Sequence, residues 1–190
     1  ELSGACIVVD ATHPFATLAS GNIRAASLAV GARCLRLARP VEALPKGVVP
    51  VASIACAARF LSENPGRALL TTGSKELAPY TSVADFAERF FVRVLPLPGA
   101  ITKCIDAGFS PSHVIGMQGP FTRELNEAML RQVGAQWLVT KDSGTVGGTA
   151  EKLAAARDVG ARCIVVTRPA EGSGALSLRE VEDALLREFA

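Results

Sequence analysis

The 190-residue sequence lacks a strong charge of either sign and lacks a long apolar run. Its formal net charge is +2, which gives no reason to expect the basic surface of a nucleic-acid-binding protein. No apolar stretch reaches the ~18 residues that a membrane-spanning helix needs. We therefore expect neither nucleic acid nor a membrane among its partners.

Residues that bind metals are also scarce. The sequence has two histidines and five cysteines, and no two cysteines form a CxxC pair, so we expect no metal site. Cys6, Cys34 and Cys163 lie in apolar runs that are typical of strands. Cysteines in such runs are usually buried thiols in a reducing compartment, and we predict a cytoplasmic protein.

Hydrophobic residues make up 49% of the chain, enough for a sizeable core. Short apolar runs ending in small or polar residues alternate with helical patterns, which predicts an α/β fold with mainly parallel sheets. We expect a capping box at Ser177 and Glu180 to open the last helix. The expected strands are residues 6–9, 34–37, 48–51, 69–72, 91–95, 114–117, 137–140 and 163–167, and the other expected helices end near residue 30, span 53–62, 98–107 and 122–133, and begin at 149.

One stretch, residues 138–152, combines a strand, a loop with three glycines and the start of a helix. Glycine lets the backbone approach a phosphate, and a helix N-terminus offers unpaired N–H groups and partial positive charge. Lys141 and Lys152 add full charges. The stretch matches neither GxGxxG nor GxxxxGK[ST], so an ordinary strand-to-helix turn is the alternative interpretation.

Two segments of the chain resemble each other. Residues 30–42 and 159–171 are identical at eight of 13 positions, and each follows a strand, an acidic loop and a helix. This similarity predicts two Rossmann-like domains with a ligand cleft between them, at residues 1–45 and 46–190. We leave open that the last helix packs on the first domain. The alternative is that the shared pattern is merely common in α/β proteins.

His13 follows the first expected strand and precedes Pro14, which turns the chain sharply. In a ligand cleft this imidazole is able to bind a carboxylate or donate a proton. The alternative is a histidine that only stabilises its loop through backbone hydrogen bonds. No sequence pattern identifies a nucleophile, which fits a reductase whose cofactor supplies the hydride.

Five motifs together resemble the precorrin-6A reductase family, in order and along essentially the whole chain. The family ordinarily begins with a glycine-rich strand and turn carrying a GGT-like sequence. This chain starts at Glu1 without that segment, and we expect it to be truncated at its N-terminus. The motifs are DATHPFA at 10–16 with Asn22, LRLARP at 35–40, TTGSK at 71–75, QGPF at 118–121 with Glu124-Leu125-Asn126, and TKDSG at 140–144.

The resemblance implies an oxidoreductase of cobalamin biosynthesis acting on a CH–CH group. It implies hydride transfer from NADPH to the macrocycle of precorrin-6A, giving precorrin-6B, and a product handed to neighbouring pathway enzymes. One alternative is a cobalt-precorrin-6A reductase of the anaerobic branch, which uses NADH. The others are a tetrapyrrole-binding enzyme without redox chemistry and a nucleotide-binding domain without catalysis.

The resemblance also suggests where the ligands bind. Thr12, His13, Pro14, Arg36 and Arg39 are the candidates for the polycarboxylate substrate. For Arg39, as for Arg168, a solvated strand end is the alternative. We assign no catalytic residue. The cofactor candidates come from three loops that follow strands: Thr72, Gly73, Ser74, Lys75, Gln118, Gly119, Pro120, Phe121, Lys141, Asp142, Ser143, Gly144, Gly147 and Gly148.

Overall fold

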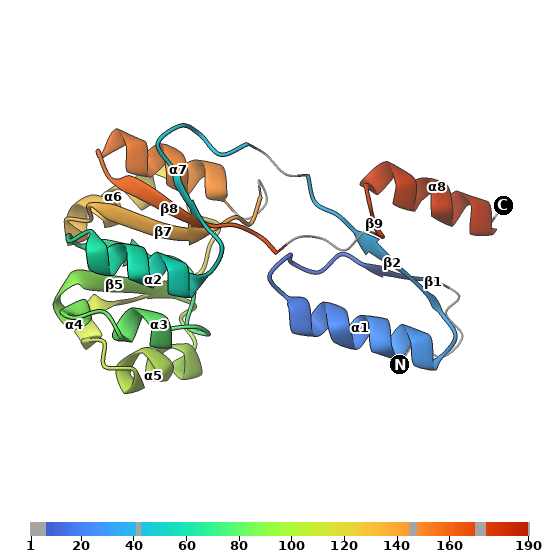
Figure 1. Ribbon diagram of the computed structural model, residues 1–190, viewed down its shortest axis with the longest axis horizontal. Coiled ribbons are helices and arrows are strands. Elements are labelled where there is room, and N and C mark those ends of the chain that lie inside the picture. Colours follow the sequence, from blue (N-terminus) through green and yellow to red (C-terminus); the bar gives the residue numbers. More distant parts are fainter. Residues whose placement is uncertain (1–6, 41–42, 145–147, 170–173, 190) are drawn as a thin grey trace. The chain divides into compact units, whose positions relative to one another are not determined.

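The computed structural model describes residues 7–40, 43–144, 148–169 and 174–189. The chain forms two compact units, which divide it between Glu42 and Ala43 and between Thr167 and Arg168 (Figure 1). Unit 1 is Glu1–Glu42 with Arg168–Ala190, and unit 2 is Ala43–Thr167. Within the described ranges, no helix has the length and apolar character needed to cross a membrane.

Unit 1 is built on a parallel three-stranded sheet in the order β1-β2-β9. Leu35 of β2 packs with Val181 and Ala184 of the last helix, so the end of the chain completes the core around the first strands. The strands are β1 (Ile7–Asp10), β2 (Arg33–Leu37) and β9 (Ala175–Leu176), and the helices are α1 (Thr17–Ala29) and α8 (Leu178–Phe189).

Unit 2 is a six-stranded sheet in the order β3-β8-β7-β4-β5-β6, with every neighbouring pair parallel. Two parallel sheets with connecting helices confirm the α/β, Rossmann-like fold class. The strands are β3 (Val49–Val51), β4 (Ala68–Leu70), β5 (Phe90–Val94), β6 (Val114–Gly116), β7 (Trp137–Lys141) and β8 (Arg162–Val166). The helices are α2 (Ile54–Glu63), α3 (Ala78–Thr81), α4 (Phe86–Arg89), α5 (Pro98–Asp106), the 3-10 turn η1 (Pro111–His113), α6 (Arg123–Val133) and α7 (Thr149–Asp158).

The strand order of unit 2 reverses direction between β4 and β7. From β4 the chain adds β5 and β6 on one side, and it then returns to place β7 and β8 on the other. The loops that follow the neighbouring strands β4 and β7 therefore lead the chain toward opposite edges of the sheet. In open parallel sheets, ligands bind in the crevice at this reversal, beyond the carboxyl ends of the strands.

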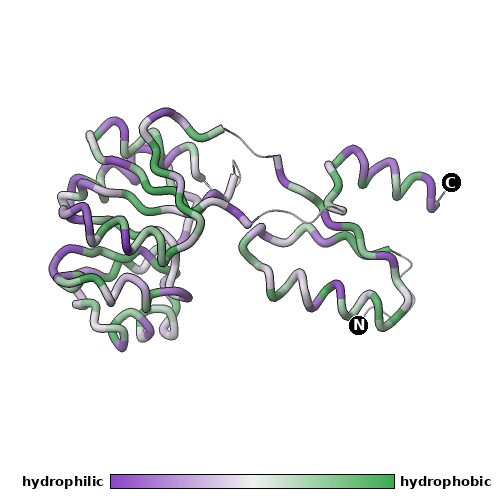
Figure 2. The backbone as a smooth tube through the Cα atoms, viewed as in Figure 1, coloured by the Kyte–Doolittle hydropathy of each residue, from purple (hydrophilic) through white to green (hydrophobic). Residues whose placement is uncertain are grey.

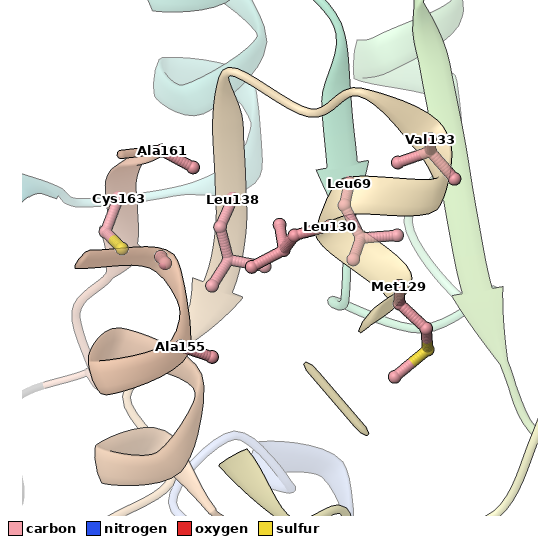
Figure 3. Packing of buried hydrophobic residues seen from close by; sticks show 9 residues of the cluster. Leu69, Met129, Leu130, Val133, Leu138, Ala155, Ala161 and Cys163 are labelled. Atoms are coloured by element: carbon pink, nitrogen blue, oxygen red, sulfur yellow. The ribbon is translucent and has the colours of Figure 1, made fainter. Parts of the chain in front are cut away.

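The core of unit 2 lies between the sheet and helices α6 and α7. Leu69 of β4 and Leu138 of β7 are buried against Leu130 of α6 and Ala155 of α7 (Figure 3). Small alanines on α7 let this helix pack closely on the strands. Figure 2 shows the strands of unit 2 as largely hydrophobic and the surrounding helices as more hydrophilic. This core holds the amino-terminal ends of α6 and α7 at the carboxyl edge of the sheet.

The helix ends follow from local sequence. Ser53 caps α2 by accepting a hydrogen bond from the Cys56 N–H, as expected. The Ser177 hydroxyl accepts from the Glu180 N–H, and the Glu180 carboxylate accepts from the Ser177 N–H, so the predicted capping box is confirmed. The sequence did not predict α3, α4, η1 or β9. The expected strand at 69–72 is shorter in the structure and ends at Leu70, although the Thr71 N–H still donates to the Val139 carbonyl of β7.

The two similar segments have the same local structure. The C-cap of the helix before each strand is a valine, Val30 or Val159, which is followed by a glycine in the left-handed region with φ of 71° or 74°. The first strand residue after each is an arginine, at the start of β2 or β8. In their described residues, which exclude 41–42 and 170–171, both segments are therefore helix-to-strand turns.

Candidate functional site

A cavity of about 930 Å³ lies in unit 2 at the carboxyl ends of its strands. It is large enough for a nucleotide-sized ligand, since small-molecule sites usually measure about 300–1,000 Å³. Residues beyond β4, β5 and β6 and from the first turns of α6 and α7 form it. The lining is Thr71, Gly73, Arg93, Val94, Leu95, Met117, Gly119, Pro120, Phe121, Thr122, Arg123, Glu124, Gly148, Glu151 and Lys152.

Two helices begin at this cavity. Thr122 is the N-cap of α6 and accepts a hydrogen bond from the Leu125 N–H, whereas Gly148 is the N-cap of α7. The first N–H groups of a helix have no partner within the helix and carry partial positive charge. Two helix N-termini at one cavity favour an anionic ligand, because each adds to the positive potential there.

Arg93 brings a buried charge to the cavity from the middle of β5. Arg93 is 6% exposed, and its Nη1 donates to the Asn126 Oδ1 at 2.8 Å. The guanidinium lies over the Phe121 ring, 3.8 Å from the centroid, and 3.7 Å separate Nη1 from the Met129 sulfur. Burial lowers the pKa of Arg93 to about 10, so it remains charged at neutral pH.

Lys152 brings a second buried charge, from the first turns of α7. Lys152 is 9% exposed, and its Nζ donates to the Thr140 hydroxyl of β7 at 3.3 Å. Burial, and then the charge of Arg93, lower the pKa of Lys152 to about 8, although Glu151 opposes the shift. Arg93 and Lys152 both line the cavity.

The loop after β7 is held by Thr149. The Ser143 N–H donates to the Thr149 hydroxyl at 3.2 Å, and the hydroxyls of these two buried residues are 3.0 Å apart. The Gly144 N–H donates to the Asp142 carboxylate, which closes a tight turn. Gly148 has φ of 65°, a conformation that glycine adopts readily. Gly147 lies outside the described residues.

The structure brings some of the predicted cofactor residues together. Those that line the cavity are Gly73, Gly119, Pro120, Phe121 and Gly148.

Other predicted cofactor residues have different neighbours. The Lys141 ammonium pairs with the Glu76 carboxylate at 2.7 Å, and the buried Thr72 hydroxyl lies 3.3 Å from the Tyr80 hydroxyl. Burial raises the pKa of Tyr80, so the phenol stays protonated. Thr72 and Lys141 stand outside the lining, as do Ser74, Lys75, Gln118, Asp142, Ser143 and Gly144.

Sequence reasoning overlooked Arg93. The strand Phe90–Val94 reads FFVRV, a run in which a single arginine among apolar residues was the available signal. A charged residue inside a strand that is buried on both faces needs a partner or a ligand, because burying a charge costs free energy. Lys152 was predicted to add charge but was not among the assigned cofactor residues.

In unit 1, Arg36 organises the loop that follows β1. Its Nη1 lies 3.0 Å from the Asp10 Oδ1 and 3.0 Å from the Thr12 hydroxyl. The Thr12 hydroxyl also donates to Asp10 at 2.7 Å and lies 2.8 Å from the Ser20 hydroxyl. Burial raises the pKa of Asp10, but bonds from Thr12 and Ser20 and the charge of Arg36 outweigh it and leave that pKa lowered. Asp10 is therefore a structural anion within this network.

His13 and Arg39 lie beside this network. The Phe15 N–H donates to the Nδ1 of His13 at 3.3 Å, which requires an Nδ1 without a proton and leaves the proton of the neutral ring on Nε2. Pro14 is buried. The Arg39 Nη2 donates to the Ala11 carbonyl at 3.4 Å. The structure thus brings Thr12, His13, Arg36 and Arg39 to one end of β1 and β2.

Arg168 connects the start of the C-terminal segment of unit 1 to the residues that follow β2. Its Nη1 donates to the carbonyls of Arg39 and Pro40, each at 3.1 Å. Among the residues that the structure describes, no three His, Cys, Asp or Glu side chains gather into a metal site. The candidate site is therefore the cavity of unit 2, which is lined by two buried cationic residues, Arg93 and Lys152.

Comparison with known proteins gives consistent results. Residues 2–186 match the family model for precorrin-6x reductase CbiJ/CobK. A cobalt-precorrin-6A reductase of Methanothermobacter thermautotrophicus is 41% identical over 170 residues, which cover 87% of this chain and 55% of that protein. Another, of Priestia megaterium, is 34% identical over 192 residues, with 97% and 74% coverage. This chain thus spans little more than half the length of the first of these relatives.

The fold is also similar to that of a solved structure. A CobK precorrin-6A reductase superposes with a TM-score of 0.75 and 26% sequence identity, over 97% of this chain and 74% of that one.

Proposed function

Because this chain belongs to the precorrin-6x reductase CbiJ/CobK family, we propose that it acts in cobalamin biosynthesis by reducing precorrin-6A to precorrin-6B. The matches to reductases of both precorrin-6A and cobalt-precorrin-6A keep the cobalt-loaded ring as the alternative substrate. The observation that carries this proposal is the match over residues 2–186, together with the cavity of unit 2 that Arg93 and Lys152 line.

We place the nicotinamide cofactor, NADPH with NADH as the alternative, in the unit 2 cavity. The lining fits a dinucleotide in three ways: two helices begin there, Gly73 and Gly148 have positive φ, and two buried cations face an otherwise mainly neutral wall. When bound, a reduced nicotinamide supplies hydride to a carbon of the substrate. The residues of the chain bind and orient that group and exclude water.

We propose that the loop after β1 binds the substrate through Thr12, His13, Pro14 and Arg39. Because the Nδ1 of His13 accepts a hydrogen bond from the Phe15 N–H, its Nε2–H is the ring group that donates to a substrate carboxylate. Arg36 acts indirectly, since its Nη1 fixes Asp10 and Thr12. The other predicted cofactor residues, such as Asp142 and Ser143, shape the loop that precedes α7.

We further propose that the two compact units correspond to the two expected Rossmann-like domains, with the last helix counted in the first. We keep the cytoplasm as the expected location and delivery of the product to the next pathway enzyme as an expected partnership. These proposals are consistent with a tetrapyrrole intermediate as substrate.

The test is a titration followed by a turnover assay. NADPH fluorescence is expected to saturate as the protein is added, and precorrin-6A is then expected to cause NADPH oxidation with formation of precorrin-6B. NADH in a parallel titration separates the two cofactors. Saturable binding without oxidation would identify a nucleotide-binding protein without this catalysis, and binding of precorrin-6A without either nicotinamide would identify a non-redox tetrapyrrole protein.

A further inference from the structure

We propose that Arg93 and Lys152 together form a phosphate clamp in the unit 2 cavity, which binds a phosphate group of the dinucleotide. The inference rests on the proposed dinucleotide site and adds the residues that anchor it. Neither residue was assigned to the cofactor by the sequence motifs.

Arg93 is a buried cation with no carboxylate partner among the described residues. Its polar contacts there are the Asn126 amide oxygen and the Met129 sulfur, both of which are neutral. A buried charge costs considerable free energy unless it is paired or well hydrogen-bonded. An anionic ligand would provide the missing countercharge.

The neighbours of Arg93 hold it in one orientation. Asn126 is 98% buried, and its amide nitrogen donates to the Thr122 carbonyl at 2.8 Å, which directs its oxygen toward Nη1. Phe121 covers one face of the guanidinium. No fully buried side-chain nitrogen or oxygen of the described residues lacks a partner, so the remaining nitrogens of Arg93 retain access to the cavity.

Lys152 and the helix ends complete the clamp. Lys152 lines the same cavity as Arg93, its Nζ donates to the Thr140 hydroxyl, and the charge of Arg93 lowers its pKa. Two neighbouring cations repel each other, and a bound dianion offsets that repulsion. The N-termini of α6 and α7 add backbone donors of the kind that bind phosphate.

The remaining charges of the lining leave the clamp positive. Arg123 pairs with Glu127 and Asp158, and the Glu124 and Glu151 residues are exposed rather than buried. The buried part of the cavity therefore carries two cations, and the carboxylates lie in its solvated part. A phosphate suits this site better than a carboxylate, because a phosphate monoester offers three acceptor oxygens to Arg93, Lys152 and the helix N–H groups, whereas a carboxylate offers two.

The test measures binding to Arg93→Met, Lys152→Met and the double variant. The probes are NADPH and NADH, followed by fluorescence, and inorganic pyrophosphate, followed by its displacement of NADPH. We expect each single variant to bind NADPH and pyrophosphate about tenfold or more weakly, as befits a lost charge-assisted bond. Arg131→Met removes an exposed, paired arginine of α6 outside the cavity, and it is expected to bind like the wild type.

The two cofactors identify the phosphate. Equal losses for NADPH and NADH would assign the clamp to the pyrophosphate, and a loss confined to NADPH would assign it to the 2′-phosphate; both support the proposal. Circular dichroism and thermal melting establish that the variants fold. If a methionine variant does not fold, Arg93→Lys and Lys152→Gln replace it, with a smaller expected loss for the first.

Unchanged affinity for all three probes in folded variants would overturn the clamp. So would unchanged NADPH affinity with weaker binding of precorrin-6A, which would assign the cations to substrate carboxylates. The proposed reductase activity fails differently: a wild-type protein whose NADPH binding depends on Arg93 and Lys152, but which does not oxidise NADPH with precorrin-6A, would retain the clamp and reject that activity.

Discussion

The guanidinium of Arg93 lies face-on over the ring of Phe121, 3.8 Å from its centroid. The two residues come from different elements, since Arg93 is in β5 and Phe121 precedes α6. This contact connects the buried charge of the sheet to the QGPF motif. It gives that motif a physical role, which is to fix the direction of a cation in the cavity.

Phe121→Leu is therefore expected to weaken NADPH binding. Leucine keeps the site apolar but removes the ring, and a partly buried cation–π contact is worth about 0.5–2 kcal/mol. We expect the dissociation constant for NADPH to rise about two- to tenfold in a fluorescence titration. Phe60→Leu is the matched control, because it removes an aromatic contact with Trp137 outside the cavity. An equal loss of affinity in both variants would contradict the role given to Phe121.

Lys152→Met is expected to stabilise the ligand-free protein. The pKa of Lys152 is about 8 in the folded state and about 10.4 in an unfolded chain, so the unfolded state binds more protons between these values. The native charge is therefore destabilising below pH 8, and its cost falls as the pH rises. We expect a higher melting temperature for the variant, by about 2–4 °C for each kcal/mol by which its free energy of unfolding increases.

The pH dependence of that difference is the specific signature. Between pH 7 and pH 9 the advantage of Lys152→Met over the wild type is expected to shrink by roughly 1 kcal/mol, measured by denaturant unfolding. The charged residues that line the cavity together with Lys152 are Arg93, Arg123, Glu124 and Glu151. These residues are the same in both proteins. A difference in stability that is constant with pH would contradict a buried ammonium at this position.

Gly148→Ala tests the backbone at the start of α7. Gly148 has φ of 65°, where a non-glycine residue costs about 1–2 kcal/mol, and its Cβ would lie 3.6 Å from the Glu151 carboxylate within the cavity lining. We expect both lower stability and weaker NADPH binding. Gly160→Ala is the control, since φ is 74° there and the Cβ would meet open space after α7. It is expected to lose stability alone.

His13→Ala tests the loop of unit 1. Removing a hydrogen bond from Nε2–H to a substrate carboxylate is expected to raise KM for precorrin-6A by about tenfold, with kcat nearly unchanged. A loss of kcat of about 10²-fold or more with normal KM would instead make His13 a proton donor. Unchanged values of both would leave His13 as a residue that only holds the turn through Phe15.

Local signals explain why most of the fold was predictable. Capping residues such as Ser53 and Ser177, and the glycines that follow α1 and α7, determine helix ends through their nearest neighbours. The alternation of elements then predicts parallel sheets. β9 was missed because two residues carry too little periodicity, and the strand order that creates the reversal at β4 and β7 depends on contacts far apart in sequence.

In the candidate site, too, local features were predictable and contacts between residues far apart in sequence were not. Glycine-rich loops predicted the region of the cavity, because backbone freedom is visible in sequence. Lys141 was predicted to bind an anionic ligand, yet it pairs with Glu76, which lies 65 residues away in the sequence. No local pattern reveals that partner. Arg93 was overlooked for the same reason, since its neighbours Phe121 and Asn126 lie on another element.

The most direct measurement is a crystal structure of the protein with bound NADPH. The account predicts the dinucleotide in the unit 2 cavity, with phosphate oxygens within about 3.2 Å of nitrogens from both Arg93 and Lys152. NADPH bound elsewhere, with these two side chains directed away from every phosphate, would contradict it.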